Sequence, residues 1–407
     1  MLTLFNLTQL KNYSIFLFIF TCALFSPTKE LVLGGVSLPE VFFVILLLLS
    51  SLSILKNIVF GKGFVIISMV SIVMTIISYI YNITPVSEIK HLLRIIEYYL
   101  IFSTFYSITT IKSIGYFKNA FLWSGLIVSL YTYVQFFFPV VFIFQNWGPS
   151  KTIDFDYSNV IYQRRMISFL DNPLNLTSYF ALLLGFIHFA VNSKLVKILF
   201  LVIVYIAGML SVSRSFILCV VISMGIILYQ GRKEKLTLVF LTLVLITLLF
   251  CLPKFDIDFS NFSRFFDKDN TDETTSQRFY VISSSIEMIR DYFLLGVGPG
   301  NFPYYYNEYR QMMASVDPTL STAENVFLQF ILDYGLLPFL SYVYIIYRFY
   351  SNSFRLRKRN AFYLSSILSV TLYLMTGFSH SLGGAANNFI FFSILGTCLR
   401  LREISSI

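Results

Sequence analysis

The sequence predicts an all-α polytopic membrane protein with about twelve transmembrane helices and one large loop containing amphipathic helices. Two observations predict this class. The chain is 57% hydrophobic and only 13% charged, whereas soluble domains contain about 25% charged residues. Apolar runs long enough to cross a bilayer as a helix, which takes about 20 residues, also recur along its whole length.

The expected spans follow one another through mostly short connections. The first apolar run has the alternative of a signal-peptide core, but no small-x-small cleavage site follows it and another span begins at once, so we expect it to be retained. The expected spans form an N-terminal bundle at 1–252, which includes a long loop at 140–173, and a C-terminal bundle at 322–407. A large loop at 253–321 separates the two bundles. The predicted spans are 13–27, 37–55, 64–82, 91–109, 119–139, 174–191, 197–213, 215–230, 236–252, 322–347, 361–379 and 384–400.

The charges orient these spans. The formal net charge is +9. With the N-terminus in the cytoplasm, the cytoplasmic segments hold 17 of the 30 cations and a net charge of +15, and the opposite side has a net charge of −5. This partition follows the positive-inside rule. The basic surplus therefore gives no reason to expect nucleic acid as a partner, and both termini are expected in the cytoplasm.

No metal-ligand pattern is present in the sequence. The four cysteines lie in or at the edge of spans without C-x-x-C spacing, and we expect them to pack as small apolar side chains. No His/Asp/Glu cluster of ligand spacing lies on the loop side. We therefore expect turnover without a metal or other cofactor.

An amphipathic helix is predicted from Arg278 onward, in RFYVISSSIEMIRDYF. We expect it to lie on the membrane face of the protein, with its apolar stripe, and the arginine that begins it, turned to protein or membrane. One face carries Arg278, Ile282, Ile286, Ile289 and Phe293, and the opposite face carries Ser284, Glu287 and Asp291.

The stretch GVGPGNFPYYYNEYR follows at 296–310. Its glycines match neither the dinucleotide fingerprint nor the Walker pattern, and Pro299 removes an amide that a phosphate nest would use. We interpret the stretch as a helix stop and re-entry turn. The tyrosines at 304–306 are interfacial anchors or sugar-stacking platforms.

Arginines on the loop side are candidates for anion binding. Arg214, in LSVSRSFIL, occupies the outer turn of a tight hairpin, where a cation is costly unless it is paired or serves a site. Arg214 has a structural alternative, in which its side chain extends to the membrane interface or donates hydrogen bonds to carbonyls at a helix end. The same alternative stays open for Arg278. Arg164 and Arg165 precede the sixth span and have lipid headgroups as an alternative. Three separate arginine clusters facing one compartment predict a phosphate or acidic sugar, carried on a lipid.

A transfer reaction would also need a base. Glu324 begins the tenth span, in LSTAENVFLQFILDYGLL. Its alternative role is structural, because S-T-A-E reads as a capping box with Ser321 as N-cap and Glu324 at N3. Histidine is scarce: His91 and His380 fall on the loop side, and His188 near the cytoplasmic end of its span.

Several motifs resemble the O-antigen ligase and O-antigen polymerase superfamily. The shared core of this family consists of an arginine at a helix start, a glycine turn, an asparagine motif, an acidic residue and G-L. It is similar to SQRFYVISSSIEMIRDYFLLGVGPGNF followed by AENVFLQFILDYGLLPFLSY in this chain. VSRS resembles the S-R hairpin of the family, and RRMISFLDNPLNLTSYF its R-x-x-G-x-F-x-x-P-N segment.

The resemblance implies a multi-pass glycosyltransferase of the bacterial inner membrane with its active site facing the periplasm. Its substrate would be an undecaprenyl-pyrophosphate-linked oligosaccharide, with membrane lipids, a chain-length regulator and a flippase as further partners. The catalytic residues would be Glu324, Arg214 and Arg278, and those binding substrate Arg164, Arg165, Asn325, Gly298, Gly300, Tyr305 and His380.

One departure from the family bears on the activity. Ligases have a histidine before the asparagine, where this chain has Glu324, which favours a polymerase of O-antigen, capsule or exopolysaccharide repeat units over a ligase acting on lipid A-core. A third alternative is a non-enzymatic flippase of lipid-linked oligosaccharides. A carrier should concentrate intramembrane charge near the midplane, whereas the unusual charges here lie at one face.

Overall fold

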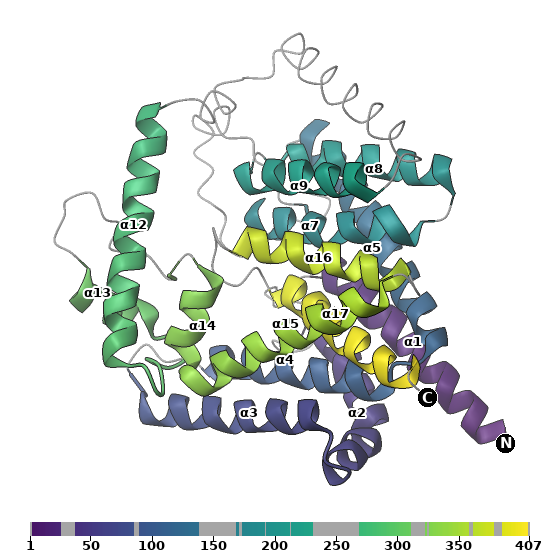
Figure 1. The fold of residues 1–407 in the computed structure, drawn as a ribbon, viewed down its shortest axis with the longest axis horizontal. Helices are drawn as coiled ribbons and strands as arrows, with labels where there is room; N and C mark the ends of the chain where they lie inside the picture. Colours follow the sequence, from purple (N-terminus) through teal and green to yellow (C-terminus); the bar gives the residue numbers. More distant parts are fainter. Residues whose placement is uncertain are drawn as a thin grey trace.

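The computed structural model describes residues 2–25, 37–84, 89–137, 168–170, 173–191, 193–211, 213–230, 268–310, 322–323, 325–357, 361–377 and 385–405. Within these ranges the secondary structure consists of helices, with no strand (Figure 1). The predicted span 236–252 lies outside the described residues.

The first eight helices lie at the positions of the predicted spans of the N-terminal half, although α1 and α5 begin 11 and 8 residues earlier than predicted. They are α1 (Leu2–Leu24), α2 (Leu38–Val59), α3 (Gly63–Tyr81), α4 (Ile89–Ile108), α5 (Ile111–Phe137), α7 (Pro173–Ala190), α8 (Lys194–Met209) and α9 (Arg214–Gln230).

The second half begins with two helices of the large loop and ends with helices that return to the bundle. They are α12 (Lys268–Asp291), α13 (Phe302–Tyr309), α14 (Val326–Tyr334), α15 (Leu336–Leu356), α16 (Ala361–Gly377) and α17 (Ala385–Ser405). The two halves are interleaved, because α16 packs along α7 and α17 along α4.

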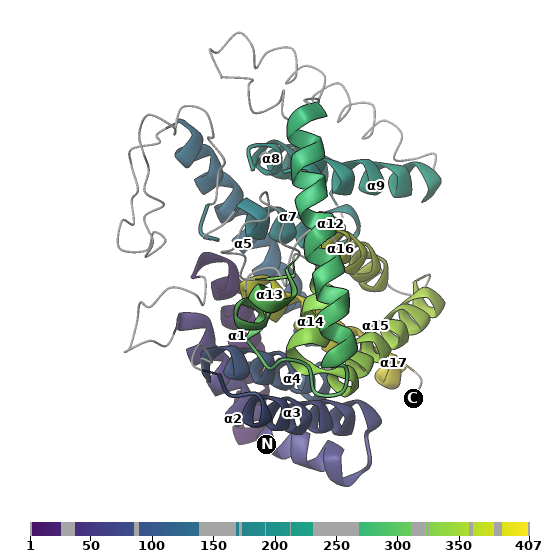
Figure 2. The same cartoon turned by 90° about the vertical axis from the view of Figure 1, so that its left-hand side faces the viewer.

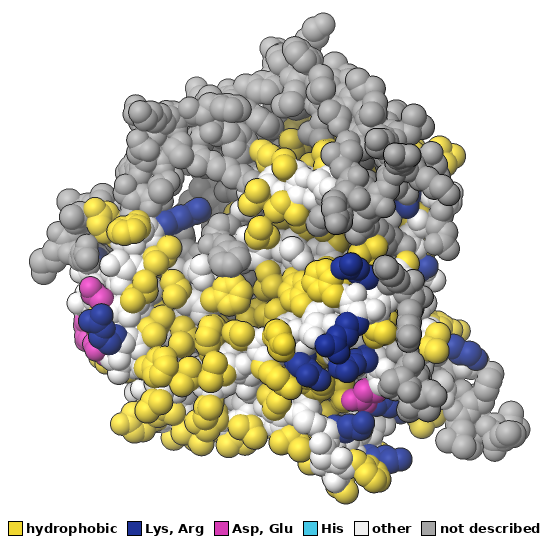
Figure 3. Space-filling model, in the orientation of Figure 1, with side chains coloured by type: hydrophobic (Ala, Val, Ile, Leu, Met, Phe, Trp, Pro, Cys, Tyr) yellow, Lys and Arg dark blue, Asp and Glu magenta, His cyan; other side chains and the backbone are white. Residues whose placement is uncertain are grey.

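Side chains in the bundle are arranged as in a membrane protein. The buried face of α3 carries small polar residues, including Ser68, Ser71, Thr75 and Ser78, which allow helices to approach closely. Apolar side chains point outward instead, and Leu52 of α2 is 80% exposed. Hydrophobic atoms form a broad surface over the lower half of Figure 3. Such an extended apolar surface is unstable in water and matches a lipid environment.

Three helices are long and apolar enough to cross a membrane by themselves: Leu7–Leu24, Leu38–Val59 and Gly63–Tyr81. Shorter apolar helices occur at Leu174–His188, Leu195–Met209, Ser215–Gly225 and Ala361–Gly377. The described residues therefore make a helical membrane protein, and the number of about twelve spans stays a prediction.

The large-loop helices lie at the opposite side of the molecule from the chain ends. Both termini are at the right of Figure 1, and α12 and α13 are at its left. The long axis of α12 runs across the bundle helices rather than along them, and α12 lies in front of the bundle in Figure 2.

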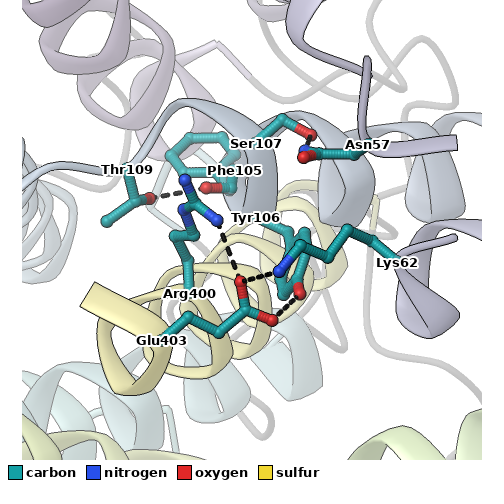
Figure 4. A network of polar contacts seen from close by, with 8 residues as sticks. All are labelled: Asn57, Lys62, Phe105, Tyr106, Ser107, Thr109, Arg400 and Glu403. Atoms are coloured by element: carbon teal, nitrogen blue, oxygen red, sulfur yellow. Dashed lines mark hydrogen bonds and ion pairs between the residues drawn. The ribbon is translucent and has the colours of Figure 1, made fainter. Parts of the chain in front are cut away.

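A polar network ties three elements together beside the C-terminus (Figure 4). Glu403 of α17 accepts hydrogen bonds from Lys62 Nζ at 3.0 Å and from Arg400 Nη1 at 2.9 Å. Tyr106 of α4 donates its hydroxyl to the other carboxylate oxygen. Burial opposes ionisation, but the hydrogen bonds from Tyr106 and Lys62 and the nearby cations prevail, and the pKa of Glu403 is lowered.

Two predicted boundaries are wrong. The predicted span 322–347 is broken at Gly335, which has φ +78° and separates α14 from α15. The amphipathic helix begins at Lys268, ten residues before Arg278, because the polar run DNTDETTSQ continues the helix.

Candidate functional site

The candidate site is built around the glycine turn, defined here as residues 296–301. After α12 ends at Asp291, Gly296, Gly298 and Gly300 all adopt positive φ, at +72°, +90° and +79°. L-residues with a Cβ rarely adopt this conformation. The prediction that these glycines stop the helix is therefore confirmed.

The glycine turn packs directly on the break between α14 and α15. A Cβ on Gly296 would overlap the Leu332 carbonyl oxygen and lie 2.8 Å from the Gly335 nitrogen. The backbone N–H of Val297 donates to Leu332 O at 2.6 Å, and Leu336 N–H donates to Leu294 O at 3.2 Å. Two glycines thus allow backbone to contact backbone, which joins the large loop to the C-terminal bundle.

Asn301 anchors the turn to the end of α3. Its side chain is fully buried. Nδ2 donates to Asn82 O at 2.7 Å and to Val297 O at 3.0 Å, and Oδ1 accepts from Thr84 Oγ1 at 2.9 Å. Asn82 Nδ2 in turn donates to Gly296 O at 3.2 Å. The sequence analysis did not identify Asn82, Thr84 or Asn301 as site residues. The available signal was Asn82, a polar residue at the end of an apolar span.

Gly300 lies between two titratable side chains from different helices. A Cβ on Gly300 would lie 2.5 Å from Cδ2 of His91, at the start of α4. The carboxyl group of Asp333, on α14, faces the Gly300 backbone N–H and is 6% exposed. His91, predicted only as a loop-side alternative for the base, is therefore a neighbour of the turn. His188 is buried near the end of α7, with Tyr205 Oη 3.4 Å from its Nε2.

The capping box predicted at Ser321 is wrong. Helix α14 begins at Val326 with Asn325 as its N-cap, and Asn325 Oδ1 accepts from Phe327 N at 3.0 Å and Leu328 N at 3.2 Å. The asparagine side chain accepts hydrogen bonds from the first backbone amides of the helix. The helix therefore begins after Asn325 rather than after Ser321. Ser321 and Glu324 themselves lie outside the described residues.

The face of α12 that packs on the protein differs from the predicted one. Val281, Ser284, Ser285 and Met288 are buried. Ser284 was predicted opposite the apolar stripe, so its burial is a correction; of the stripe itself, Ile289 packs against the protein and Ile286 is 51% exposed. Serine is small enough to allow close packing, which explains why a polar residue occupies this contact. Arg278 is exposed, so of the two predicted surroundings, protein or membrane, it does not face the protein.

A small hydrophobic core nonetheless brings α12 close to the segment before α14. It combines Val281 and Met288 of α12 with Val297 of the turn, Ala323 and Leu332. Arg278 lies one helical turn before Val281. The structure thus gathers the second half of α12, the glycine turn and Ala323, the residue before position 324, around one core.

Other predicted site residues are described only in part. Arg214 is the first residue of α9, at the predicted hairpin after α8, and its side chain is outside the described atoms. Arg164, Arg165 and His380 lie outside the described residues.

Tyr305 belongs to an aromatic cluster on α13. Its ring lies 4.9 Å from that of Tyr292 and 5.3 Å from that of Tyr304. Tyr309 Oη donates to Asp291 Oδ2 at 2.6 Å. Partial burial and the neighbouring tyrosines raise the pKa of Tyr305, so its hydroxyl remains a neutral donor and acceptor at physiological pH. The cluster offers both flat rings and polar groups to a ligand.

Within the described ranges, no three His, Cys, Asp or Glu side chains gather as metal ligands would. The expectation that turnover needs no metal stays a prediction.

Comparison with known families gives one match. Residues 198–343 match the family model described as O-antigen ligase. This segment runs from α8 into α15 and includes Arg214, α12, the glycine turn and α14. No curated protein matches the chain.

Proposed function

Because the match of residues 198–343 supports the O-antigen ligase and polymerase superfamily, we propose that this membrane protein is a polysaccharide repeat-unit polymerase. It would transfer glycan from undecaprenyl pyrophosphate to a sugar hydroxyl at the periplasmic face of a bacterial inner membrane. The observation that carries the proposal is the packing of Val281 and Met288 of α12, Val297 of the glycine turn, and Ala323 and Leu332 around one core. Motifs distant in sequence there form one unit opposite the chain termini.

The proposed reaction breaks the bond between the anomeric carbon and the pyrophosphate oxygen and forms a glycosidic bond. Arg214 and Arg278 would hold the pyrophosphate, because guanidinium groups stabilise the negative charge that develops on the leaving group. The exposure of Arg278 keeps its guanidinium accessible to such a ligand. Arg164, Arg165 and His380 would assist in binding the donor.

The acceptor hydroxyl must lose its proton as it attacks. We assign Glu324 as the base, which takes the proton from the acceptor oxygen. The observed start of α14 supports this assignment. The alternative role for Glu324 was in a capping box, but Asn325 caps this helix instead. His91 is the alternative base, since its ring packs on Gly300.

The glycan would approach from the periplasmic side. Tyr305 and its neighbouring rings would stack on sugar faces. Gly298 and Gly300, whose Cβ positions are occupied by Asn82, Asn301 and His91, would contribute to substrate binding by shaping the backbone of the turn. A flippase would deliver the lipid-linked repeat, and a chain-length regulator would set the length of the product.

The test compares two variants with the unsubstituted purified protein, each supplied with lipid-linked repeat units isolated from its own organism. Glu324→Gln should reduce turnover about a hundredfold, the scale of general-base catalysis, and Glu324→His should retain part of the activity. Protein level should be unchanged in both. Full elongation by Glu324→Gln would instead assign the base to His91 or His380.

Two alternatives make different predictions in cells. Deletion of a polymerase leaves a single repeat on the lipid A-core, whereas deletion of a ligase leaves none. Ligase activity is the second candidate because of the family match itself. Transport of lipid-linked repeats without elongation would support the flippase alternative.

A further inference from the structure

Two buried polar side chains on α14 have no role in the mechanism above. Gln329 is 5% exposed and Asp333 is 6% exposed. They are four residues apart and therefore neighbours on one face of the helix. Asp333 Oδ1 is buried and has no hydrogen-bond partner among the described residues. Burial of a carboxyl group lowers stability unless the group is hydrogen-bonded, so the contacts that Asp333 makes with neighbouring segments are the feature to explain.

Gln329 holds the segment that precedes α14. Its Oε1 accepts from the Ala323 backbone N–H at 2.6 Å, and Ala323 is fully buried, so water does not compete for this amide. Asn325, on the other side of position 324, is fixed by its bonds to the first amides of α14. Both chain neighbours of Glu324 are thus attached to the same helix.

Asp333 connects this helix face to the glycine turn. Its carboxyl group faces both the Gln329 side chain and the Gly300 backbone N–H. Helix α14 therefore has the Ala323–Asn325 segment at one end and the glycine turn at the other, and the Gln329–Asp333 pair connects the two. Neither side chain reaches outward, because both are more than nine-tenths buried.

We propose that Gln329 and Asp333 are positioning residues that set the distance between the glycine turn and the Ala323–Asn325 segment. The structural part of this inference stands without the proposed function. Its effect on catalysis rests on the proposed function. On the proposed function, the pair would hold the glycine turn and Ala323, the residue before Glu324, in register, so that donor and acceptor hydroxyl can meet at reacting distance. A misplacement of about 1 Å in such an arrangement can cost a hundredfold in rate.

The test uses the full-length protein in detergent and measures backbone hydrogen exchange together with elongation. Gln329→Met keeps the length and volume of the side chain but removes the acceptor, so little repacking is expected. Asp333→Asn is the second variant and keeps the shape of the carboxylate. Asn352→Ala is the matched control, because it removes a buried amide that accepts from Arg402 beside the C-terminus.

In Gln329→Met, exchange at Ala323 should rise about tenfold or more, and kcat should fall by a similar factor. KM for the lipid-linked donor should change less than about threefold, because the lost interaction acts on the reacting geometry. Asp333→Asn should raise exchange in the glycine turn and lower kcat. The control should change neither quantity.

Unchanged exchange at Ala323 in Gln329→Met would overturn the proposal. Faster exchange with normal kcat would also overturn it, since the contact would then be structural only. Absence of elongation by the unsubstituted protein would contradict the proposed polymerase, and the exchange measurement would still decide whether the pair holds the two segments.

Discussion

At the scale of single residues, Gly300 is a position where we expect the addition of one methyl group to lower the stability of the folded protein strongly. Alanine at φ +79° costs about 1–2 kcal/mol for the left-handed conformation, and its Cβ would lie 2.5 Å from His91 Cδ2. Gly61→Ala is the control, because Gly61 has φ +66° but nothing within 4 Å of a Cβ. Gly300→Ala should lower the thermal unfolding midpoint in detergent more than Gly61→Ala does. Equal shifts would contradict the packing of His91 on the turn.

Asn325 is the residue whose structural and ligand-binding roles can be separated by one substitution. Asn325→Ala removes the cap and should cost about 1 kcal/mol. Asn325→Asp keeps the oxygen that accepts from Phe327 N and Leu328 N, so its unfolding midpoint should stay close to normal. It loses the side-chain N–H donors and adds a negative charge near the expected pyrophosphate, so elongation should fall. Normal elongation by Asn325→Asp would reduce Asn325 to a cap.

The residues that the sequence could not predict are those that meet only after folding. The glycine motif predicted its own turn, because positive φ is a local requirement of the backbone. Asn82 follows α3, Asn301 lies in the glycine turn and Asp333 lies on α14, and each contacts backbone atoms of a distant segment. No local pattern encodes such partners.

At the scale of elements, hydrophobic runs predicted most helices, because a lipid-facing helix must be apolar along about 20 residues. Local patterns failed where tertiary packing decided the outcome. The break at Gly335 was missed because LQFILDYGLLPFL is apolar on both sides of it, while the break exists to receive the Leu294–Leu295 backbone. The rotation of α12 was missed because its protein-facing side contains Ser284 and Ser285.

The outward face of α12 should contact lipid. It carries Phe279 at 69% exposure and Ile286 at 51%, seven residues apart and thus aligned on one side. Nitroxide labels at Ile286→Cys and Glu287→Cys test this in bilayers, because these adjacent positions point in different directions. The label at 286 should collide more with oxygen, and the label at 287 more with a water-soluble nickel chelate. Equal collision with the nickel chelate would place this face in water.

At the scale of the whole molecule, the Glu403 network links α4, α17 and the turn before α3. The pKa of Glu403 is lowered in the folded protein, so its contribution to stability is present above the unfolded pKa of about 4.3. That contribution is lost as pH falls through the lower folded value. Both Lys62 and Glu403 are partly exposed, so the effect should be modest. The difference in unfolding midpoint between the unsubstituted protein and Glu403→Gln should be present at pH 7 and shrink below about pH 4. A difference independent of pH would contradict the ionic origin of the network.

The arrangement of the whole chain across the membrane follows from where the charges and the site lie. Figure 1 places both termini opposite α12, and Lys and Arg side chains are frequent on the side of the C-terminus in Figure 3. The net charges of +15 and −5 on the two predicted sides predict that this side faces the cytoplasm. A membrane-impermeant maleimide added to intact cells with a permeabilised outer membrane should therefore label Asp269→Cys, in α12, and not Arg357→Cys, at the end of α15. Both should react once the inner membrane is opened, which controls for the accessibility of each thiol. Labelling of Arg357→Cys in intact cells would invert the predicted orientation, and it would contradict the periplasmic site on which the polymerase proposal depends.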